Sequence, residues 1–163
     1  MKSIPQVKRP RFSLARKDKP MEELVRETDQ KTLAVWATDC AERVLPYFEE
    51  KYPKDLRPHN AFVVLRAWIT TGVFRMADIR GASLASHAAA REVGEDTAAR
   101  SAARAAGQAV ATAHVPTHCL GAAYYALQAV WRATNSSDTD TAVAKERDWQ
   151  YRHLLELKDS PEH

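Results

Sequence analysis

The chain has 163 residues, of which 45% are hydrophobic and 28% charged, and a formal net charge of +3, all ordinary for a globular domain. This length predicts one domain that buries roughly 70% of its unfolded-chain surface. No run of about 18 apolar residues and no apolar N-terminal segment occurs, so the sequence predicts neither a membrane span nor a signal peptide. The two cysteines, Cys40 and Cys119, each lie in an apolar stretch, which favours reduced thiols and a cytoplasmic location.

Positive charge is concentrated at the N-terminus. Residues 1–20 contain seven Lys or Arg and one Asp, a balance of +6, whereas the other 143 residues contain 17 Lys or Arg and 20 Asp or Glu, a balance of −3. Three prolines and little apolar periodicity predict a flexible basic arm over 1–27, followed by a helical domain over 28–158 and a short tail over 159–163. A basic arm can attract nucleic acid or an acidic partner.

Apolar residues at three- and four-residue spacing predict the first full helix. Asp29 is placed as its N-cap, and Pro46 should end or kink it near Leu45. A short helical turn is expected before it, over 21–27. The apolar stripe of the helix consists of Leu33, Trp36, Ala37, Cys40 and Val44.

Five more helices follow from similar signals. Pro58 suits the start of the second helix and Gly72 its end. Gly94 should end the third helix, and Asp96 is placed to cap the fourth. No convincing strand pattern occurs. The sequence therefore predicts an all-α, single-domain bundle of about six helices, the last five over 58–72, 76–93, 97–113, 117–133 and 141–158.

The segment from Gly81 to Ala126 has the most unusual composition. It contains 17 alanines and four of the five glycines. Alanine is the best helix former, and small side chains let two helix backbones approach closely. We therefore expect two or three tightly packed central helices, rich in Ala and Gly, with larger helices packed against them.

Histidine spacing suggests a metal site as one alternative. His114 and His118 are four residues apart, a spacing that places two imidazoles on one helix face, and His114 also continues an apolar strip, so we expect it to point inward. His87 and Asp39 are candidates for further ligands of a divalent metal such as zinc. Pro116, which can break the helix between the histidines, and the missing Glu of an HExxH motif oppose this reading. Hydrogen-bonded core histidines, with no cofactor, are the other interpretation.

Catalytic patterns are absent from the sequence. It contains no Gly-rich phosphate loop, GxSxG elbow, CxxC motif or paired ExxH motif. Cys40 lies beside Asp39, but its place in an apolar stripe favours an inert buried thiol over a nucleophile. A non-enzymatic protein is therefore favoured.

A series of longer motifs carries a family resemblance. The run DCAERVLPYFEEKYPKDLRPHNA at 39–61 is followed by a Trp-bearing helix and then by SHAAAR, RAAGQAVATAH, HCLGAAYYALQAV and ERDWQ. In this order, over about residues 33–155, the chain resembles a bacterial immunity protein family of the immunity-five-like type. The resemblance implies a helical protein that neutralises a toxin by protein–protein contact, with no established catalytic set. The basic arm and Pro116 are departures from the family pattern.

Polar residues within these motifs form the candidate partner-binding set. Asp39 and Arg43, and likewise Asp55 and Arg57, are spaced to form ion pairs that order the link between the first two full helices. Alternatively, the set lines a groove between the first, third and fourth predicted helices. The candidate binding residues are Asp39, Glu42, Arg43, Asp55, Arg57 and Trp149.

Three functions remain open at the level of sequence. The first is an immunity protein that binds a toxin. The second is a small metal-binding protein, with hydrolysis as an extension, that uses His87, His114 and His118. The third is nucleic-acid binding through residues 1–20, with base stacking disfavoured because the arm is nearly free of aromatic residues. A homo-oligomer formed through Ala-faced helices or through exposed aromatic residues such as Trp131 or Trp149 is compatible with each.

Overall fold

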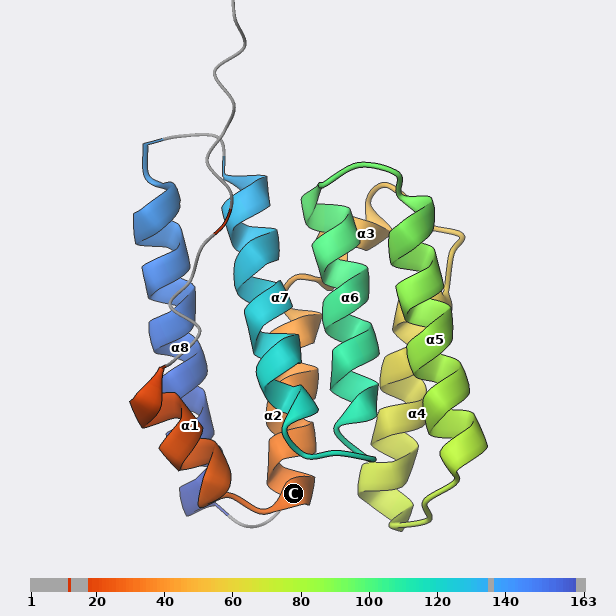
Figure 1. Cartoon of the computed structure of the whole chain (residues 1–163), viewed down its shortest axis with the longest axis vertical. Helices are drawn as coiled ribbons and strands as arrows, with labels where there is room; N and C mark the ends of the chain where they lie inside the picture. Colours follow the sequence, from red (N-terminus) through yellow and green to blue (C-terminus); the bar gives the residue numbers. More distant parts are fainter. Residues whose placement is uncertain (1–11, 13–17, 135–136, 161–163) are drawn as a thin grey trace, which may run out of the picture.

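A computed structural model of the protein describes residue 12 and residues 18–134 and 137–160, which form eight α-helices and no strand. Figure 1 shows α5, α6, α7 and α8 side by side, with α2 and α4 behind them and α1 across one end of α8. None of the helices in these ranges is long and apolar enough to cross a membrane. The helices are α1 (Lys19–Arg26), α2 (Gln30–Glu42), α3 (Leu45–Glu49), α4 (Arg57–Thr71), α5 (Met76–Glu92), α6 (Ala98–Ala111), α7 (His118–Ala133) and α8 (Thr139–Asp159).

Two short helices are additional to the six predicted. Helix α1 replaces the expected short turn and lies within the segment predicted as a flexible arm. It forms because Asp18 accepts a hydrogen bond from the Met21 amide at 3.3 Å and because the helix buries Met21, Leu24 and Val25. Helix α3 begins at Leu45, with Pro46 in its first turn, where a missing N–H costs nothing. The other residues predicted for the arm lie outside the described part of the chain, except Phe12, Asp18 and Glu27.

Local signals set most of the helix ends. Asp29 caps α2 by accepting a hydrogen bond from the Thr32 amide at 2.9 Å, as predicted. Gly72 ends α4 in the left-handed conformation with φ of 69°, which favours glycine. The predicted cap of α6 is corrected: the N-cap residue is Thr97, and Asp96 pairs with Arg100 instead.

Helix α6 lies at the centre and packs most extensively against α7 and α5. Its buried face consists almost entirely of small side chains, so the neighbouring helix backbones can come close. The larger core side chains lie on α2, α3 and α4 and include the fully buried Trp36, Phe48 and Phe62. The buried residues of α6 are Ala99, Ser101, Ala102, Ala103, Ala105, Ala106, Gly107, Ala109 and Val110.

Two buried hydrogen bonds connect α8 to α2 and α7. Trp36 Nε1 of α2 donates a hydrogen bond to the Gln150 carbonyl at 2.8 Å. The Gln150 side chain, which is 1% exposed, in turn donates from Nε2 to the Ala123 carbonyl of α7 at 3.1 Å. One residue of α8 therefore connects two other helices through bonds that are shielded from water.

Replacing the indole of Trp36 tests this connection. Trp36→Phe removes the donor and leaves unfilled volume in a fully buried site, so we expect the free energy of unfolding to fall by about 1–3 kcal/mol. Urea denaturation followed by circular dichroism measures the change. Trp68→Phe, at a half-buried tryptophan of α4, serves as the control and should cost less. Equal stability of the two variants would show that the Trp36 contact does not hold α8.

Candidate functional site

Four of the predicted binding residues lie at contacts of α2, and three of these four, Asp39, Arg43 and Trp149, lie at its contact with α8. The Arg43 guanidinium forms two bonds to Glu146, from Nε at 2.8 Å and from Nη2 at 2.7 Å, and its Cζ lies 3.9 Å from the centroid of the Trp149 ring. Trp149 stacks on His153 with centroids 4.7 Å apart, and His153 Nε2 lies 2.7 Å from Asp39 Oδ2. The predicted side-chain pair between Asp39 and Arg43 is therefore not formed, because each residue has a partner on α8.

Sequence reasoning missed Glu146 and His153. Together with Trp149 they follow a three- and four-residue spacing along α8, which places them on one face of that helix. The spacing was visible in the sequence. It gave no indication that this face meets α2.

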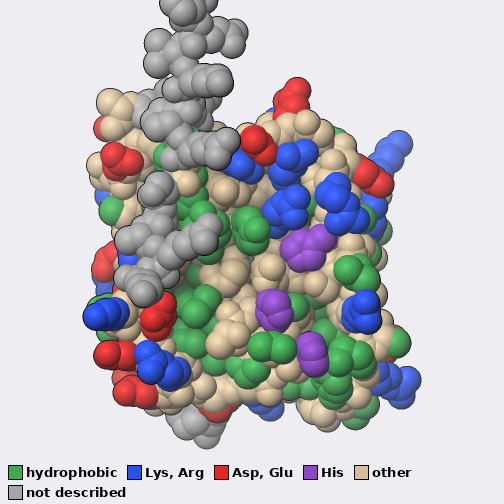
Figure 2. Space-filling view, in the orientation of Figure 1, with side chains coloured by type: hydrophobic (Ala, Val, Ile, Leu, Met, Phe, Trp, Pro, Cys, Tyr) green, Lys and Arg blue, Asp and Glu red, His purple; other side chains and the backbone are tan. Residues whose placement is uncertain are grey.

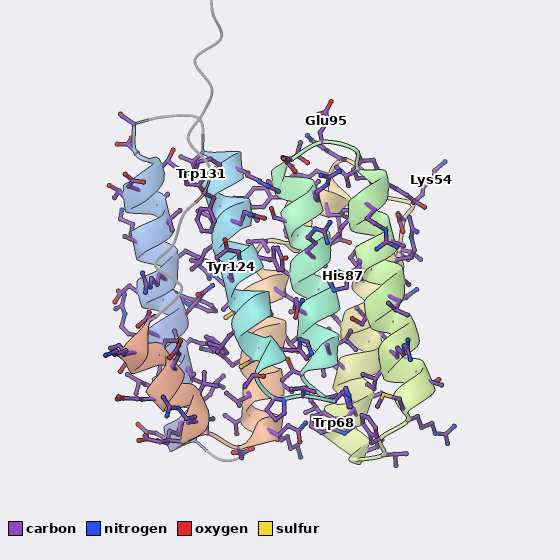
Figure 3. The ribbon with its side chains drawn as sticks, in the orientation of Figure 1. Lys54, Trp68, His87, Glu95, Tyr124 and Trp131 are labelled. Atoms are coloured by element: carbon purple, nitrogen blue, oxygen red, sulfur yellow. The ribbon has the colours of Figure 1, made fainter. Side chains whose placement is uncertain are left out.

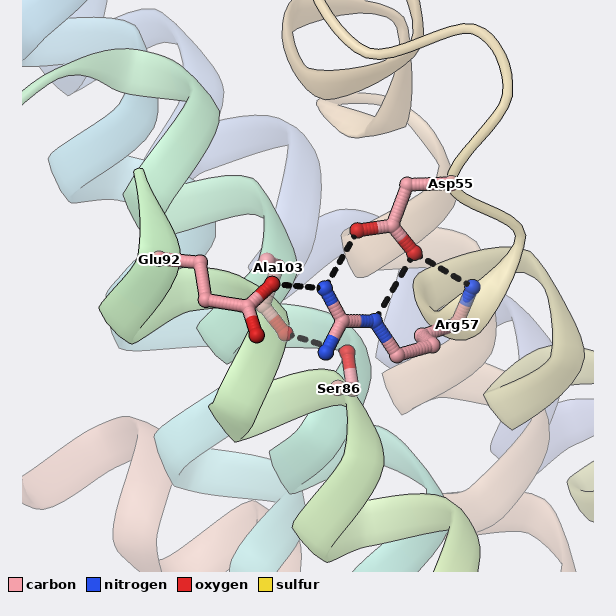
Figure 4. Close-up of polar contacts among 5 residues, drawn as sticks. All are labelled: Asp55, Arg57, Ser86, Glu92 and Ala103. Carbon is pink, nitrogen blue, oxygen red and sulfur yellow. Dashed lines mark hydrogen bonds and ion pairs between the residues drawn. The ribbon is translucent and has the colours of Figure 1, made fainter. Parts of the chain in front are cut away.

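The predicted pair Asp55–Arg57 is formed, and Arg57 also connects α4 to α5 through Glu92 (Figure 4). Arg57 Nε donates to Asp55 Oδ1 at 2.9 Å and Nη2 to Oδ2 at 2.7 Å, and the guanidinium also pairs with Glu92 at the end of α5. The hydrogen bonds from Arg57 hold the pKa of the Asp55 carboxyl below its usual value. Nearby, Ser86 Oγ donates to the Ala103 carbonyl at 2.7 Å, which fastens α5 to α6.

Glu42, the last of the predicted set, pairs with Arg66 of α4. The six candidate residues thus lie at three contacts, namely α2 with α8, α2 with α4, and α4 with α5. They do not follow one groove between the helices named in the prediction. All six side chains interact within the domain.

The three candidate metal ligands gather near one face, where Figure 2 shows histidine side chains over α5 to α7. His87 lies on α5 and His118 opens α7, whereas His114 lies in the connection between α6 and α7. His114 is exposed and stacks on Phe74 with centroids 6.1 Å apart, so the prediction that it points inward is wrong. Helix α6 ends at Ala111, before Pro116, which places His114 outside any helix.

Two glycines shape this face, on which Figure 3 labels His87 of α5. A Cβ added to Gly107 would lie 2.7 Å from Nε2 of His87, and one added to Gly121 would lie 2.8 Å from Oε1 of Gln108. The side chains of His87 and Gln108 therefore lie flat against the backbone of the next helix. His118 Nδ1 lies 2.8 Å from the same Oε1 of Gln108, and since the amide oxygen only accepts, Nδ1 donates.

The electrostatics of this face favour neutral imidazoles. Burial, followed by the positive charges of Arg104 and Arg91, lowers the pKa of His87, whose Nδ1 is shielded and has no hydrogen-bond partner among the described residues. Burial and the neighbouring His114 lower the pKa of His118. Within the described ranges, no group of three or more His, Cys, Asp or Glu side chains is placed to hold a metal ion. The zinc interpretation therefore has no ligand set in this part of the chain.

Exposed apolar side chains lie beside the histidines. Val73, Phe74 and Met76, at the α4–α5 connection, are 57%, 42% and 43% exposed, and Val115, next to His114, is 37% exposed. We call these four residues the apolar edge. A groove of about 690 Å³ between α4 and α5 adjoins it and includes Val73 and the half-buried Trp68 in its lining.

The sequence matches the family described as "Imm-5 like putative immunity protein" over residues 23–157, which is well over half of the chain. The chain belongs to this family. No curated protein and no solved structure matches it. The match to the Imm-5 like family begins within α1 and ends within α8, so it includes the two contacts of Gln150 and all of the contacts between α2 and α8 described above.

A double-mutant cycle tests the contact of His87 with Gly107. Alanine in a helix interior is favoured over glycine by about 1 kcal/mol, but its methyl group would collide with the imidazole. Gly107→Ala should therefore stabilise the His87→Ala variant by about 1 kcal/mol and leave the wild type unchanged or less stable. Chemical denaturation of the four proteins gives the coupling energy. The same effect in both backgrounds would mean that the ring does not occupy the space above Gly107.

The lowered pKa of His87 predicts a pH dependence of stability. Below the ordinary histidine pKa of 6.5, the unfolded chain takes up a proton at this residue before the folded one does, so stability is present above that pH and is lost as pH falls. We expect His87→Gln to show a smaller loss of stability between pH 7.5 and 5.5 than the wild type. The exposed His59, changed to Gln, is the control. A matching loss in wild type and His87→Gln would argue against a depressed pKa.

Proposed function

We propose that this protein acts without catalysis, as an immunity protein that neutralises a toxin by direct protein–protein contact. Family membership supports the immunity role. The apolar edge is the observation that carries the contact mechanism, because four large apolar side chains stay exposed together at one end of the bundle. Contiguous exposed apolar side chains mark interaction surfaces more often than scattered ones.

The apolar edge has the geometry of a docking surface. Its residues come from two regions far apart in the sequence, the α4–α5 connection with the first residue of α5 and the α6–α7 connection, and Phe74 of the first region stacks on His114 of the second. The adjoining groove between α4 and α5 offers a recess of about 690 Å³ for an apolar side chain of the partner. An aromatic residue beside a recess, with polar residues around it, is typical of the energetic centre of a protein interface.

The predicted binding set has a different status in this proposal. Each of its six residues interacts inside the domain, so a partner would have to compete with these contacts or use the side chains as they stand. Its role in binding stays a prediction. Reversing the charges of Glu42 and Asp55 would remove the pairs with Arg66 and Arg57, so a loss of binding in that variant must be separated from a loss of stability.

The other two sequence-level functions receive less support. The metal interpretation has no ligand set among the described residues. Nucleic-acid binding through residues 1–20 stays a prediction, because most of that arm lies outside the described residues. The tryptophans named for a homo-oligomer both have ring contacts within the chain, Trp131 with Phe12 and Trp149 with His153.

A substitution at the apolar edge tests the proposal. Phe74→Asp places a charge at the centre of the edge, and we expect it to weaken the partner complex by about 30-fold or more, the loss of a typical interface hot spot of 2 kcal/mol. The tagged chain is used to isolate the partner from the native host lysate at moderate salt, and calorimetry with the purified partner gives the affinities.

Leu155→Asp is the matched control, since Leu155 is 37% exposed on α8, away from the edge. Circular dichroism confirms that both variants are folded. If the wild-type chain captures no protein, or only a second copy of itself, the toxin-binding function is refuted. If it captures a partner that Phe74→Asp binds as tightly, the function stands but the apolar edge is not the contact.

A further inference from the structure

We propose that four arginines at the other end of the α5–α6 face bind carboxylate groups of the protein partner. We call them the arginine ridge: Arg91, Arg100, Arg104 and Arg132. This inference rests on the proposed function and names the chemistry of the partner's surface. Figure 2 shows Lys and Arg side chains gathered over the upper ends of α5 and α6, above the histidines.

The ridge is built from three helices. Arg91 lies in the last turn of α5, Arg100 and Arg104 lie one turn apart on α6, and Arg132 lies in the last turn of α7. Their charges act on one another and on shared neighbours. Arg104 and Arg91 both lower the pKa of His87, and Arg100 and Arg104 add to the effect of burial in lowering that of Arg132.

Two of the four ridge arginines form ion pairs inside the domain, and these two share one carboxylate. Asp96 lies 2.9 Å from Arg100 and 3.6 Å from Arg132, and these two arginines also bond to the Ala90 carbonyl and the Ser101 hydroxyl. The guanidinium groups of Arg91 and Arg104 form no hydrogen bond or ion pair with any described residue. Two unpaired guanidinium groups thus lie near two others, in a chain whose residues after the first 20 carry a net charge of −3. The positive charges of these guanidinium groups repel one another, and this repulsion is relieved when an anion binds.

The number of free charges favours carboxylates over a nucleic acid. Proteins that hold DNA through its backbone neutralise about 6–10 phosphates. The ridge has four arginines, and two of them already share Asp96. A few carboxylates on a protein surface match this count. The ridge ends at the α5–α6 connection, where the acidic residues Glu95 and Asp96 follow one another in the sequence.

The ridge and the apolar edge lie within the span of one interface. Residues at three- and four-residue spacing along α5 connect them, from Met76 through the 54% exposed Leu84 to His87 and Arg91. A helix rises 1.5 Å per residue, so these 15 steps span about 22 Å. A standard interface covers about 800 Å² on each partner, or roughly 30 Å across. One partner with an apolar centre and an acidic rim therefore fits both.

A titration resolved by residue tests the ridge in the full chain. The probe is a ten-residue glutamate peptide, followed through the arginine Nε–Hε signals in two-dimensional NMR at 50 mM NaCl. In the wild-type chain, we expect the peptide to shift the Arg91 and Arg104 signals. In the double variant Arg91→Glu/Arg104→Glu, the affinity for the peptide, measured at the Arg100 and Arg132 signals, should fall by about fivefold or more. Arg26→Glu/Lys51→Glu makes the same change in net charge at exposed residues of α1 and the α3–α4 connection, and should leave the ridge signals within twofold of wild type.

The outcomes separate this inference from its alternatives. If only signals of the basic arm shift, or if the two double variants behave alike, the ridge binds no carboxylates and the inference is overturned. It is also overturned if a ten-nucleotide single-stranded DNA shifts the ridge signals at lower concentration than the peptide. Binding of the peptide at the ridge without any captured partner would refute the toxin-binding function alone. A captured partner that tolerates Arg91→Glu/Arg104→Glu would refute the ridge alone.

Discussion

The close approach of α5, α6 and α7 is the constraint on which the rest of the structure depends. Helix α6 buries almost only alanine, glycine and serine, so its neighbours pack near its backbone and leave no internal room for longer side chains. Where glycine removes even the methyl group, at Gly107 and Gly121, the side chains of His87 and Gln108 lie flat across the helix surface. The side chains of His87 and Gln108 are therefore held partly buried against the neighbouring helix, as a direct result of the small-residue packing.

Local chemistry made much of the fold predictable. Asp29, Gly72, Pro46 and Pro58 each act within a few residues of their own position, so they mark helix ends whatever the tertiary context. Helices α1 and α3 were not predicted as full elements, because segments of eight and five residues show too little periodicity to be distinguished from turns. Helix α1 also begins in a proline-containing basic stretch, where composition argued for flexibility.

The candidate site was less predictable, because its contacts join distant parts of the chain. Asp39 and Arg43 have the spacing of an ion pair within one helix, which contributes only about 0.3–0.5 kcal/mol when exposed. The Arg43 guanidinium instead forms two hydrogen bonds to Glu146 and stacks on Trp149, and these contacts together outweigh the local pair. His114 looked buried because it continues an apolar pattern, which loses its meaning where α6 ends. Phe74 and Val115 carried no functional signal, since an apolar residue in a sequence is by default a core residue.

The six predicted binding residues and the two unpaired arginines therefore differ in what they contact. Arg43, Arg57 and Asp39 already bond inside the domain, so a partner that engaged them would have to replace existing contacts and would gain little. The guanidinium groups of Arg91 and Arg104, which have no partner among the described residues, would lose only contacts with water on binding. Binding would also remove the exposed apolar surface of Phe74 from water, which is favourable. In the proposed function, binding free energy therefore comes from the apolar edge and the arginine ridge, and not from the contacts of the six predicted residues. In this family member, the six predicted binding residues form contacts between elements of the bundle, and the proposed partner surface consists of side chains outside those contacts.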